Sequence, residues 1–243
     1  MASVELDRLV VQYGTGAPVL DGLDLRIADG EFFVLVGPSG CGKSTVLRML
    51  AGLDRPKSGT VRIGGTDVTS TPAHDRDVAM VFQNYAIYPH MSVRRNIGYG
   101  LRVRGADRAT ERARVEEVGR LLGLDTLLDR RPATLSGGQL QRVAIALALA
   151  LRAEVLLADE PTSALDVTVQ AEVLELLREL RDSRGMAVLF VSHDLAVIAE
   201  LCDRVAIMRA GQVVEQGPTG QVIAAPRHDY TRELLAAVPR LGE

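Results

Sequence analysis

The sequence has no tryptophan and only two cysteines among its 243 residues. Cys41 and Cys202 lie far apart and form no Cys-x-x-Cys pair, so the sequence indicates neither a zinc site nor a disulfide framework. Aromatic residues make up 4% of the chain and the formal net charge is −3, which argues against a protein that stacks on bases or coats a polyanion. We therefore expect free thiols and no direct contact with nucleic acid.

Long hydrophobic runs are also missing. The longest uninterrupted apolar run, Val143 to Leu151, is far shorter than the roughly 18 residues that a membrane span needs. The first five residues contain neither the basic nor the apolar region of a signal peptide, so the expected location is the cytoplasm. With 47% hydrophobic and 24% charged residues, the composition is typical of a folded globular protein.

The chain begins with a β-rich stretch and continues with a different pattern. Residues 4–13 and 19–27 are predicted to be antiparallel strands joined by a turn that contains glycine and proline. Apolar strands followed by turns and helices then recur at Phe32–Val36, Val155–Ala158 and Val188–Val191, the pattern of a parallel α/β sheet whose strands are buried on both faces.

Helical sequence separates the first two of these strands. Ser92–Leu128 and Gln139–Leu151 are predicted to be helical, and residues 84–152 are taken as an approximate helical insert within a single domain of residues 1–243. A further helix of roughly four turns, with one apolar face, is predicted after Asp166.

A phosphate-binding loop is predicted between the strand Phe32–Val36 and the next helix, where the sequence fits Gly-x-x-x-x-Gly-Lys-Ser. Glycines let successive backbone N–H groups surround a phosphate, and the helix N-terminus adds partial positive charge. Lys43 can reach the terminal phosphates and Ser44 can offer its hydroxyl to Mg²⁺. A turn that merely joined strand to helix would not explain a lysine followed by two hydroxyl residues. The candidate ATP-binding residues are Gly37, Pro38, Ser39, Gly40, Cys41, Gly42, Lys43, Ser44 and Thr45.

Two acidic residues end the apolar strand at Val155–Ala158, which resembles a Walker B motif. The carboxyl ends of strands form the edge of an open α/β sheet where ligands bind. Asp159 would hold Mg²⁺ there, and Glu160 would polarise the water that attacks the γ-phosphate. A solvated acidic pair is the alternative, and the phosphate loop upstream argues against it.

The most specific motif of the sequence, residues 135–139, lies at the start of the second predicted helix of the insert. Ser136 is suited to cap this helix, and the glycines expose the helix N-terminus to an anion. The motif resembles the signature of the ATP-binding cassette family, whose motif order matches nearly the whole chain. The resemblance implies an α/β fold: a RecA-like P-loop NTPase core with an N-terminal antiparallel β subdomain and an inserted α-helical signature subdomain. The signature residues are Leu135, Ser136, Gly137, Gly138 and Gln139.

In that family the signature of one subunit closes on ATP held by the phosphate loop of another. The resemblance therefore implies an Mg²⁺-dependent ATPase that works as a head-to-tail dimer with two sandwiched nucleotides. Three single residues and one loop match further family positions. Tyr13 resembles the aromatic residue that stacks on adenine, and Gln83 resembles the glutamine that contacts Mg²⁺ and the attacking water. His193 resembles the switch histidine that contacts the γ-phosphate. The loop that touches the opposite subunit would be Ser163, Ala164, Leu165 and Asp166.

Each of these assignments has a simpler alternative. Tyr13 could pack on an edge strand, His193 could be a satisfied histidine at a strand end, and Asp166 is a suitable helix N-cap whatever else it does. The sequence also departs from the family pattern, because Leu140 and Leu147 stand where the family commonly has cations in the signature helix. We expect this change to affect a shared phosphate site, either by weakening closure or by making the contact more apolar.

The segment from Tyr85 to Val93 resembles the surface by which sugar-importer ATPases grip the coupling helices of their membrane subunits. Exposed aromatic and apolar side chains could anchor there in a partner's groove, although a helix that packs internally is the alternative. The segment from Arg94 to Arg114 contains seven arginines and only two acidic residues. We interpret this excess of positive charge first as a solvated helical face and second as a surface attracted to anionic lipid headgroups.

The resemblance favours solute import, with transmembrane permease subunits and an extracytoplasmic solute-binding protein as partners. The protein would then act at the cytoplasmic face of a bacterial membrane. The alternative is a non-transport cassette that acts on ribosomes or nucleic acid, but those branches usually carry paired cassettes or long coiled-coil inserts, and this sequence has one phosphate loop and no sustained heptads.

The two halves of the chain resemble different importers. Residues up to Gly105 resemble carbohydrate importers, whereas residues 161–170 and 217–239 resemble oligopeptide and dipeptide importers. Neither resemblance identifies the substrate, which the membrane and binding-protein subunits would select. The chain ends before the regulatory C-terminal domain typical of sugar importers, so we do not expect regulation through such a domain.

Overall fold

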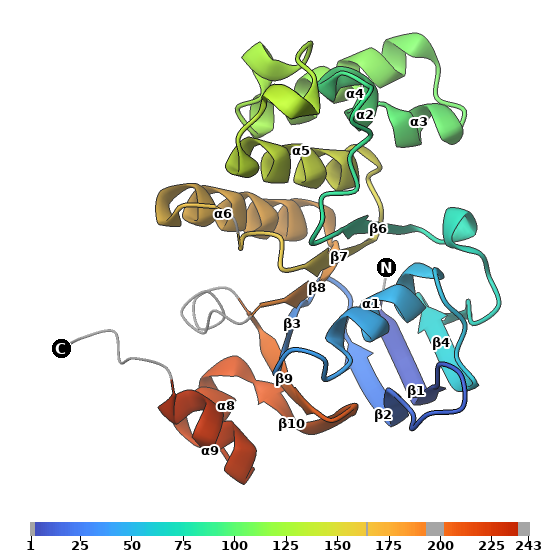
Figure 1. The fold of residues 1–243 in the computed structure, drawn as a ribbon, viewed down its shortest axis with the longest axis vertical. Helices are drawn as coiled ribbons and strands as arrows, with labels where there is room; N and C mark the ends of the chain where they lie inside the picture. The colour runs from blue at the N-terminus through green and yellow to red at the C-terminus, as the bar shows by residue number, and fades with distance from the viewer. Residues whose placement is uncertain (1–2, 164, 193–201, 238–243) are drawn as a thin grey trace.

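The computed structural model describes residues 3–163, 165–192 and 202–237. In this part of the chain the strands form two sheets, and a group of helices stands at one end of the molecule (Figure 1). The first sheet has the strand order β2-β1-β4-β5 and is antiparallel. Its strands are β1 (Val4–Val11), β2 (Leu20–Ile27), β4 (Ser58–Ile63) and β5 (Thr66–Asp67).

The predicted antiparallel pair at the start of the chain is confirmed. Val4 lies opposite Ile27 and Val11 opposite Leu20, and both strands alternate buried apolar with more exposed residues. Strand β1 ends at Val11, so residues 12–19 form a longer connection than a tight turn. Alternation of this kind places one face of the sheet in the core and leaves the other near solvent.

The second sheet has the order β10-β9-β3-β8-β7-β6, with parallel pairing from β9 to β6 and an antiparallel edge strand β10. The three strands that the sequence predicts to be buried are buried along their whole length. This arrangement confirms the predicted α/β P-loop NTPase class. The strands are β3 (Phe32–Val36), β6 (Val78–Val81), β7 (Val155–Asp159), β8 (Ala187–Val191), β9 (Arg204–Arg209) and β10 (Gln212–Pro218).

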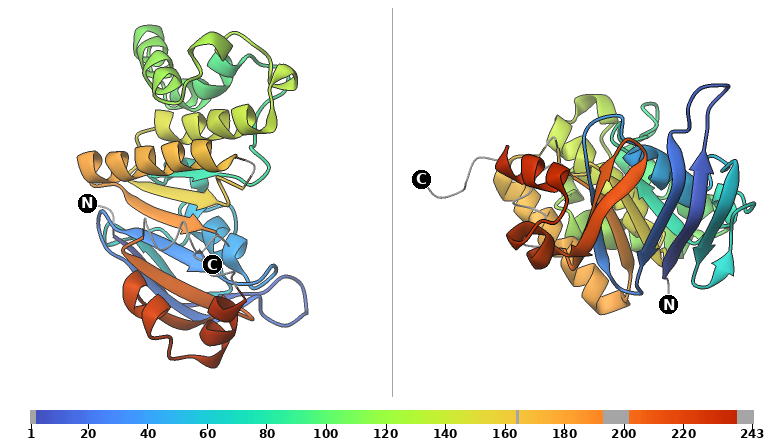
Figure 2. Two further views of the ribbon diagram at one scale, coloured as in Figure 1. Left: turned by 90° about the vertical axis from the view of Figure 1, so that its left-hand side faces the viewer. Right: turned by 90° about the horizontal axis from the view of Figure 1, so that it is seen from below.

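Alternate residues of the central strands face two different cores, which explains why these strands are apolar throughout. Phe33 and Leu35 pack in one cluster with helix α1 (Lys43–Ala51) and the antiparallel sheet. Phe32 and Val34 pack in the other with helices α5 (Gly137–Ala150) and α6 (Val167–Arg184). The result is a layered molecule in which α6 lies between the parallel sheet and the other helices of the upper end (Figures 1 and 2).

The predicted helix over Ser92–Leu128 is three shorter helices. A break at Gly98 separates the first two, where a side chain would collide with Glu111, since an added Cβ would lie 2.2 Å from its Oε1. A turn with Gly105 at φ +79° follows, and Asp107 then caps the third helix by accepting from Ala109 and Thr110 N–H groups. The three helices are α2 (Val93–Ile97), α3 (Tyr99–Val103) and α4 (Arg108–Leu121).

The other helix boundaries lie within a few residues of those predicted. Helix α5 begins at Gly137, two residues earlier than expected, and α6 extends over 18 residues, longer than the expected four turns. The helical segment α2 to α5 lies between β6 and β7 in the chain, and the bounds 84–152 stay a prediction. Two helices, α8 (Thr219–Ala224) and α9 (Asp229–Ala236), follow β10, and short 3₁₀ turns lie at Ala73–Asp75, Asp125–Leu127 and Pro132–Thr134.

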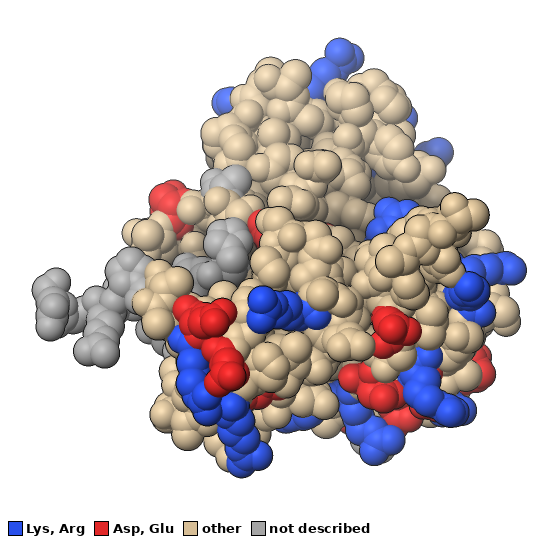
Figure 3. Space-filling view, turned by 60° about the horizontal axis from the view of Figure 1, so that its bottom comes forward, with Lys and Arg blue, Asp and Glu red and all other residues tan. Residues whose placement is uncertain are grey.

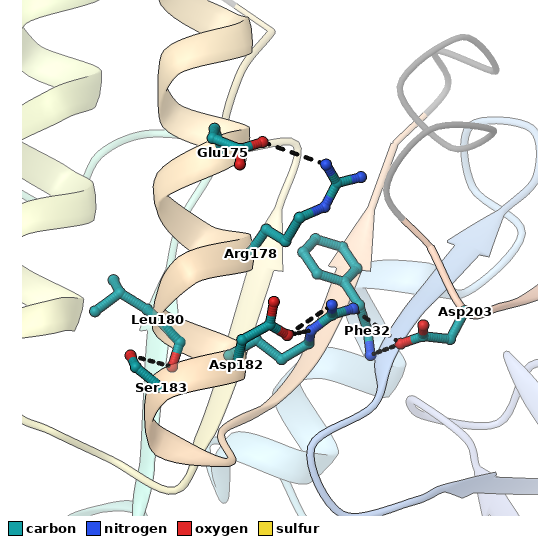
Figure 4. Close-up of polar contacts among 8 residues, drawn as sticks. Phe32, Glu175, Arg178, Leu180, Asp182, Ser183 and Asp203 are labelled. Carbon is teal, nitrogen blue, oxygen red and sulfur yellow. Dashed lines mark hydrogen bonds and ion pairs between the residues drawn. The ribbon is translucent and has the colours of Figure 1, made fainter.

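The C-terminal half of α6 is fixed to the parallel sheet by one aspartate. Arg181 forms ion pairs with Asp182 at 2.7 Å and with Asp203 at 3.1 Å. The carboxylate of Asp203 also accepts from the backbone N–H of Phe32 at 2.8 Å, at the start of β3 (Figure 4). The C-terminal end of α6 is thus held against the start of β3.

Charges of both signs lie next to one another over the lower part of the surface in Figure 3, whereas the charged side chains visible at the top are Lys and Arg. Five of the seven arginines in the segment 94–114 pair with acidic residues, among them Arg94 with Asp129 and Arg102 with Glu111. This pairing fits a solvated helical face. Throughout the described ranges, every helix is too short or too polar to span a lipid bilayer.

Candidate active site

The phosphate loop connects the end of β3 to the start of α1, as predicted. Lys43 is buried, and its ammonium group donates to the carbonyl oxygens of Gly37 at 2.7 Å and Pro38 at 2.9 Å. Helix α1 begins at Lys43 after the N-cap residue Gly42, has no side-chain cap and has no acidic residue in its first turn. The N–H groups and the partial positive charge of this helix end are therefore available to an anion, with a lysine held beside them.

Two glycines of the loop are required by the space around them. A Cβ at Gly37 would lie 2.4 Å from the backbone oxygen of Met208, in the neighbouring strand β9. Gly42 has φ +108°, and a Cβ there would lie 2.7 Å from Leu20. The loop is therefore pressed against β9 and β2, and larger residues at these positions would displace it.

Ser44 and Asp159 meet at the carboxyl ends of β3 and β7. Asp159 is 8% exposed, and its burial raises the pKa of its carboxyl above the ordinary value, although a hydrogen bond with Ser44 lowers that pKa. Glu160 raises the same pKa through its negative charge and Lys43 lowers it. A hydroxyl beside a carboxylate is a donor set suited to Mg²⁺, which usually takes few protein ligands and completes its shell with water and phosphate oxygens. These residues fit the ion.

Glu160 adopts a backbone conformation that is uncommon for a residue with a side chain. Its φ is +48°, and its N–H donates to the carbonyl of Val191 in the adjacent strand β8 at 3.1 Å. Such a left-handed residue costs roughly 1–2 kcal/mol and persists only when its surroundings hold it. The carbonyl of Glu160 accepts from the hydroxyl of Ser163 at 3.1 Å, which supplies part of that support.

The side chain of Glu160 meets Gln83, which follows β6. The amide nitrogen of Gln83 lies 3.5 Å from Oε2 of Glu160, at the limit of a hydrogen bond. Tyr85 and Ala86, which follow shortly after Gln83, also have positive φ values, of 61° and 50°. The structure thus brings together the glutamine and the glutamate that the sequence selects separately, at the same edge as Lys43 and Ser44.

Gln141 is a site residue that the sequence analysis missed. It is 3% exposed on α5, and its side-chain amide donates to the backbone carbonyl of Glu160 at 3.3 Å. The available signal was an amide side chain in a mostly apolar helix, between Leu140 and Arg142. This hydrogen bond connects the helix that carries the signature to the residue proposed to activate water.

The signature residues form the start of α5. Ser136 accepts from the backbone N–H of Gln139 at 3.3 Å, and the side chain of Gln139 accepts from the N–H of Ser136 at 3.0 Å, a reciprocal capping box. Gly137 and Gly138, which lie between them, add no side chains at this end of the helix. A cavity of about 480 Å³ opens beside it, lined by Ser136, Gly138, Gln139, Arg142, Asp166, Val169 and three residues that follow α4.

The loop before α6 contributes to the same hollow. Asp166 accepts from the N–H of Val169 at 2.9 Å and so acts as the N-cap of α6, while Leu165 packs against the helical core. Val167 is 85% exposed at the first position of α6. Ala164 and the predicted switch residue His193 lie outside the described residues, and their roles stay predictions.

Tyr13 lies in the connection between β1 and β2. The residue is 52% exposed, and its hydroxyl donates to Asp54, which follows α1, at 2.8 Å. The ring therefore does not pack away against the edge strand, the alternative that the sequence left open. Asp54 gave no signal in the sequence.

The two leucines that replace family cations occupy different places. Leu140 is half-buried one residue after the signature, but Leu147 lines an apolar hollow of about 310 Å³ with Phe82, Tyr88, Tyr99 and residues of α2, α3 and α5. Seven residues of helix separate the two, about 10 Å along the axis. The structure thus differs from the expectation that both lie at the phosphate site, because Leu147 faces the segment after Gln83. Tyr88 and Tyr99 stand at this hollow with ring centroids 4.9 Å apart.

Two similar proteins are named as ATP-binding proteins of transport systems. The chain is 46% identical over 233 residues to the diacetylchitobiose uptake system ATP-binding protein MsiK of Streptomyces coelicolor, covering 96% of this chain and 60% of that protein. It is also 46% identical to the sulfoquinovosyl glycerol transport ATP-binding protein SmoE of Agrobacterium fabrum, covering 98% and 66%. The chain thus spans about three fifths to two thirds of the length of these relatives.

A solved structure has the same fold over most of the chain. The dimeric ATP-binding cassette MJ0796, in a post-hydrolysis state bound to ADP and Pi, matches with a TM-score of 0.83 and 32% identity, covering 89% of this chain and 98% of that one. The family described as ABC transporter matches residues 20–163, more than half of the sequence. On this evidence the chain belongs to the ABC transporter family of ATP-binding cassettes.

Proposed function

We propose that this chain is the ATP-hydrolysing subunit of a transporter and converts ATP and water to ADP and phosphate. The observation that carries the proposal is the meeting of Lys43, Ser44, Asp159 and Glu160 at one edge of the parallel sheet. Lys43 and the start of α1 would bind the β- and γ-phosphates. The relatives whose names describe uptake and ATP binding support this assignment.

Ser44, Asp159 and Gln83 would hold the Mg²⁺ ion, which when bound neutralises charge on the phosphates during their transfer. The carboxylate of Glu160 would accept a hydrogen bond from the attacking water and orient this water toward the γ-phosphate. The amide of Gln83 would hold the same carboxylate in place. Acid–base assistance of this kind is worth roughly 10²–10⁴ in rate. His193 is assigned to the γ-phosphate by resemblance alone.

The signature supports a composite site shared by two subunits. The capped but unobstructed start of α5 is suited to meet an anion, since its glycines add no bulk and the helix end carries partial positive charge. We assign it to the ATP of a second cassette, either another copy of this chain or a related one. The dimeric cassette with bound ADP and Pi supports this arrangement.

Solute import is the transport direction that the relatives favour. The named relatives take up diacetylchitobiose or transport sulfoquinovosyl glycerol, which supports a carbohydrate-related system more than a peptide system. The exposed tyrosines beside Leu147 would dock a permease subunit, so the protein would act at the cytoplasmic face of a bacterial membrane. An extracytoplasmic solute-binding protein would deliver the substrate.

Two substitutions test the ATPase assignment. Lys43→Ala is expected to abolish ATP binding, because it removes the cation beside the phosphates. Glu160→Gln is expected to keep ATP binding and lower turnover by at least about 100-fold. Equal hydrolysis rates for wild type and Glu160→Gln would refute the role of Glu160, and stable association with ribosomes in place of membranes would refute transport.

A further inference from the structure

The ring of Tyr13 is held from outside its own loop. The connection between β1 and β2 spans eight residues and lies near the surface, where an exposed tyrosine ring would ordinarily sample several rotamers. Here the phenol donates to Asp54 Oδ2 at 2.8 Å, across 41 positions of sequence. About half of the residue stays exposed while its hydroxyl is held by Asp54.

Asp54 is itself held by helix α1. Arg48 donates through Nε to Oδ2 of Asp54 at 2.7 Å and through Nη2 to Oδ1 at 3.1 Å, the two-pronged geometry that makes arginine–carboxylate pairs specific. The aspartate side chain is 22% exposed and the arginine 45%. Arg48 lies about one and a half turns after Lys43, on the same helix whose first residues are proposed to bind the phosphates.

A second set of contacts fixes the loop at the neighbouring position. Lys57 donates to the side-chain oxygen of Gln12 at 2.5 Å, and its backbone N–H donates to the carbonyl of Val10 at 2.8 Å. The segment 54–57 after α1 therefore holds two successive residues of the loop, Gln12 and Tyr13. The contacts of Gln12 limit how far the loop backbone can move, while the contact of Asp54 sets the ring.

We propose that Asp54 and Arg48 are positioning residues for base binding: together they hold the Tyr13 ring in the orientation that stacks on adenine, so that α1, through Arg48, connects the phosphate end of the ATP site to its base end. The inference rests on the proposed ATPase function. Stacking on an aromatic ring contributes more when the ring is already ordered, because less side-chain entropy is lost on binding.

The electrostatics of the group agree with this arrangement. The hydrogen bond from Arg48 lowers the pKa of Asp54, which therefore stays a charged acceptor at neutral pH. Burial, and after it the hydrogen bond to Asp54, raises the pKa of the Tyr13 phenol, which keeps its proton and remains the donor. Donor and acceptor are thus fixed over the whole physiological range.

The experiment compares a ligand that has a base with one that lacks it. Binding of ADP and of inorganic tripolyphosphate, each with Mg²⁺, is measured by calorimetry on the full chain. Asp54→Ala is expected to weaken ADP binding about two- to tenfold, the value of one hydrogen bond, and to leave tripolyphosphate binding unchanged. Asp54→Asn, which keeps an oxygen acceptor for Tyr13, is expected to recover most of the ADP affinity.

Variants of the tyrosine separate this inference from the proposed function. Tyr13→Ala is expected to weaken ADP binding about 5- to 100-fold through loss of stacking. Tyr13→Phe should match Asp54→Ala, and combining the two changes should cost no more than either alone, because both remove the same hydrogen bond. If Tyr13→Ala leaves ADP binding unchanged, the assignment of Tyr13 to adenine fails and the inference with it.

Other outcomes overturn the inference alone. If Tyr13→Ala weakens ADP binding but Asp54→Ala does not, the ring needs no positioning by Asp54. If Asp54→Ala weakens tripolyphosphate as much as ADP, the aspartate supports the general fold of α1. Asp129→Ala is the matched control, because it removes an exposed aspartate paired with Arg94 at 3.0 Å in the helical segment and should change neither ligand.

Discussion

The side-chain amide of Gln141 donates to the backbone carbonyl of Glu160 at 3.3 Å. This contact joins the helix that begins with the signature to the residue assigned to water activation. A movement of α5 would therefore displace the backbone of Glu160, whose φ of +48° already depends on its neighbours. The signature and the hydrolytic residue are connected within one subunit, as well as across the proposed dimer.

Gln141→Leu tests this connection. Leucine fills nearly the same volume in a site that is 3% exposed, so the fold should survive, but the carbonyl of Glu160 loses a donor. We expect the KM for ATP to change less than twofold and kcat to fall about three- to tenfold, corresponding to one hydrogen bond. Gln170→Leu, on the half-buried face of α6, is a control for the amide-to-leucine change. Unchanged kcat in Gln141→Leu would remove the proposed coupling.

The raised pKa of Asp159 predicts a pH effect on Mg²⁺ binding. Burial favours the protonated carboxyl, so protons compete with Mg²⁺ at a higher pH than they would at an ordinary aspartate with a pKa of about 3.9. The Mg²⁺ concentration that half-saturates ADP binding should therefore rise as the pH is lowered toward that range. Calorimetry at a series of pH values measures this dependence.

Asp159→Asn provides the comparison for the pH series. Asparagine cannot ionise, so the variant should need more Mg²⁺ at neutral pH and should lose most of the pH dependence. A wild type and an Asp159→Asn variant with the same pH profile would show that another group controls Mg²⁺ binding.

Substitution of Arg76, which lies outside the proposed ATP site, is predicted to have a large effect on stability. Arg76 is 3% exposed, and its guanidinium donates to the last carbonyls of α1, at 2.6 Å to Met49 and 2.8 Å to Leu50. Arg76→Ala removes this donor from both buried acceptors, of which Met49 keeps only the N–H of Gly52 at 3.2 Å, and it creates a cavity, so we expect the free energy of unfolding to fall by about 2–4 kcal/mol. Urea unfolding measures the loss. Arg26→Ala, which removes an exposed arginine paired with Glu5, should change stability by less than about 0.5 kcal/mol.

Much of the fold follows from the sequence because its signals are local. The apolar run at Phe32–Val36 predicts a strand buried on both faces, and the structure shows alternate residues in two different cores. The motif of Lys43 and Ser44 predicts the loop between this strand and α1. Both features depend on residues close together in the chain, where periodicity and glycine placement carry the information.

The missed features depend on contacts between distant segments. Glu111 occupies the space where a side chain at Gly98 would lie, between α2 and α3, and no local pattern shows this. Asp54 meets Tyr13 across 41 positions, and Leu147 lines a hollow together with residues of the segment after Gln83. The positive φ of Glu160 is set by the adjacent strand. Such relationships require the packed structure.

The composite site of two subunits is the central claim, and the mass of Glu160→Gln in solution tests it most directly. Size-exclusion chromatography with light scattering would be run with and without Mg-ATP, beside a variant that also carries Ser136→Arg. We predict that ATP doubles the mass from that of the 26.2 kDa chain, and that Ser136→Arg prevents the change by obstructing the signature. A mass of one chain for Glu160→Gln at saturating ATP, under conditions where calorimetry shows that ATP is bound, would contradict a site completed by a second copy.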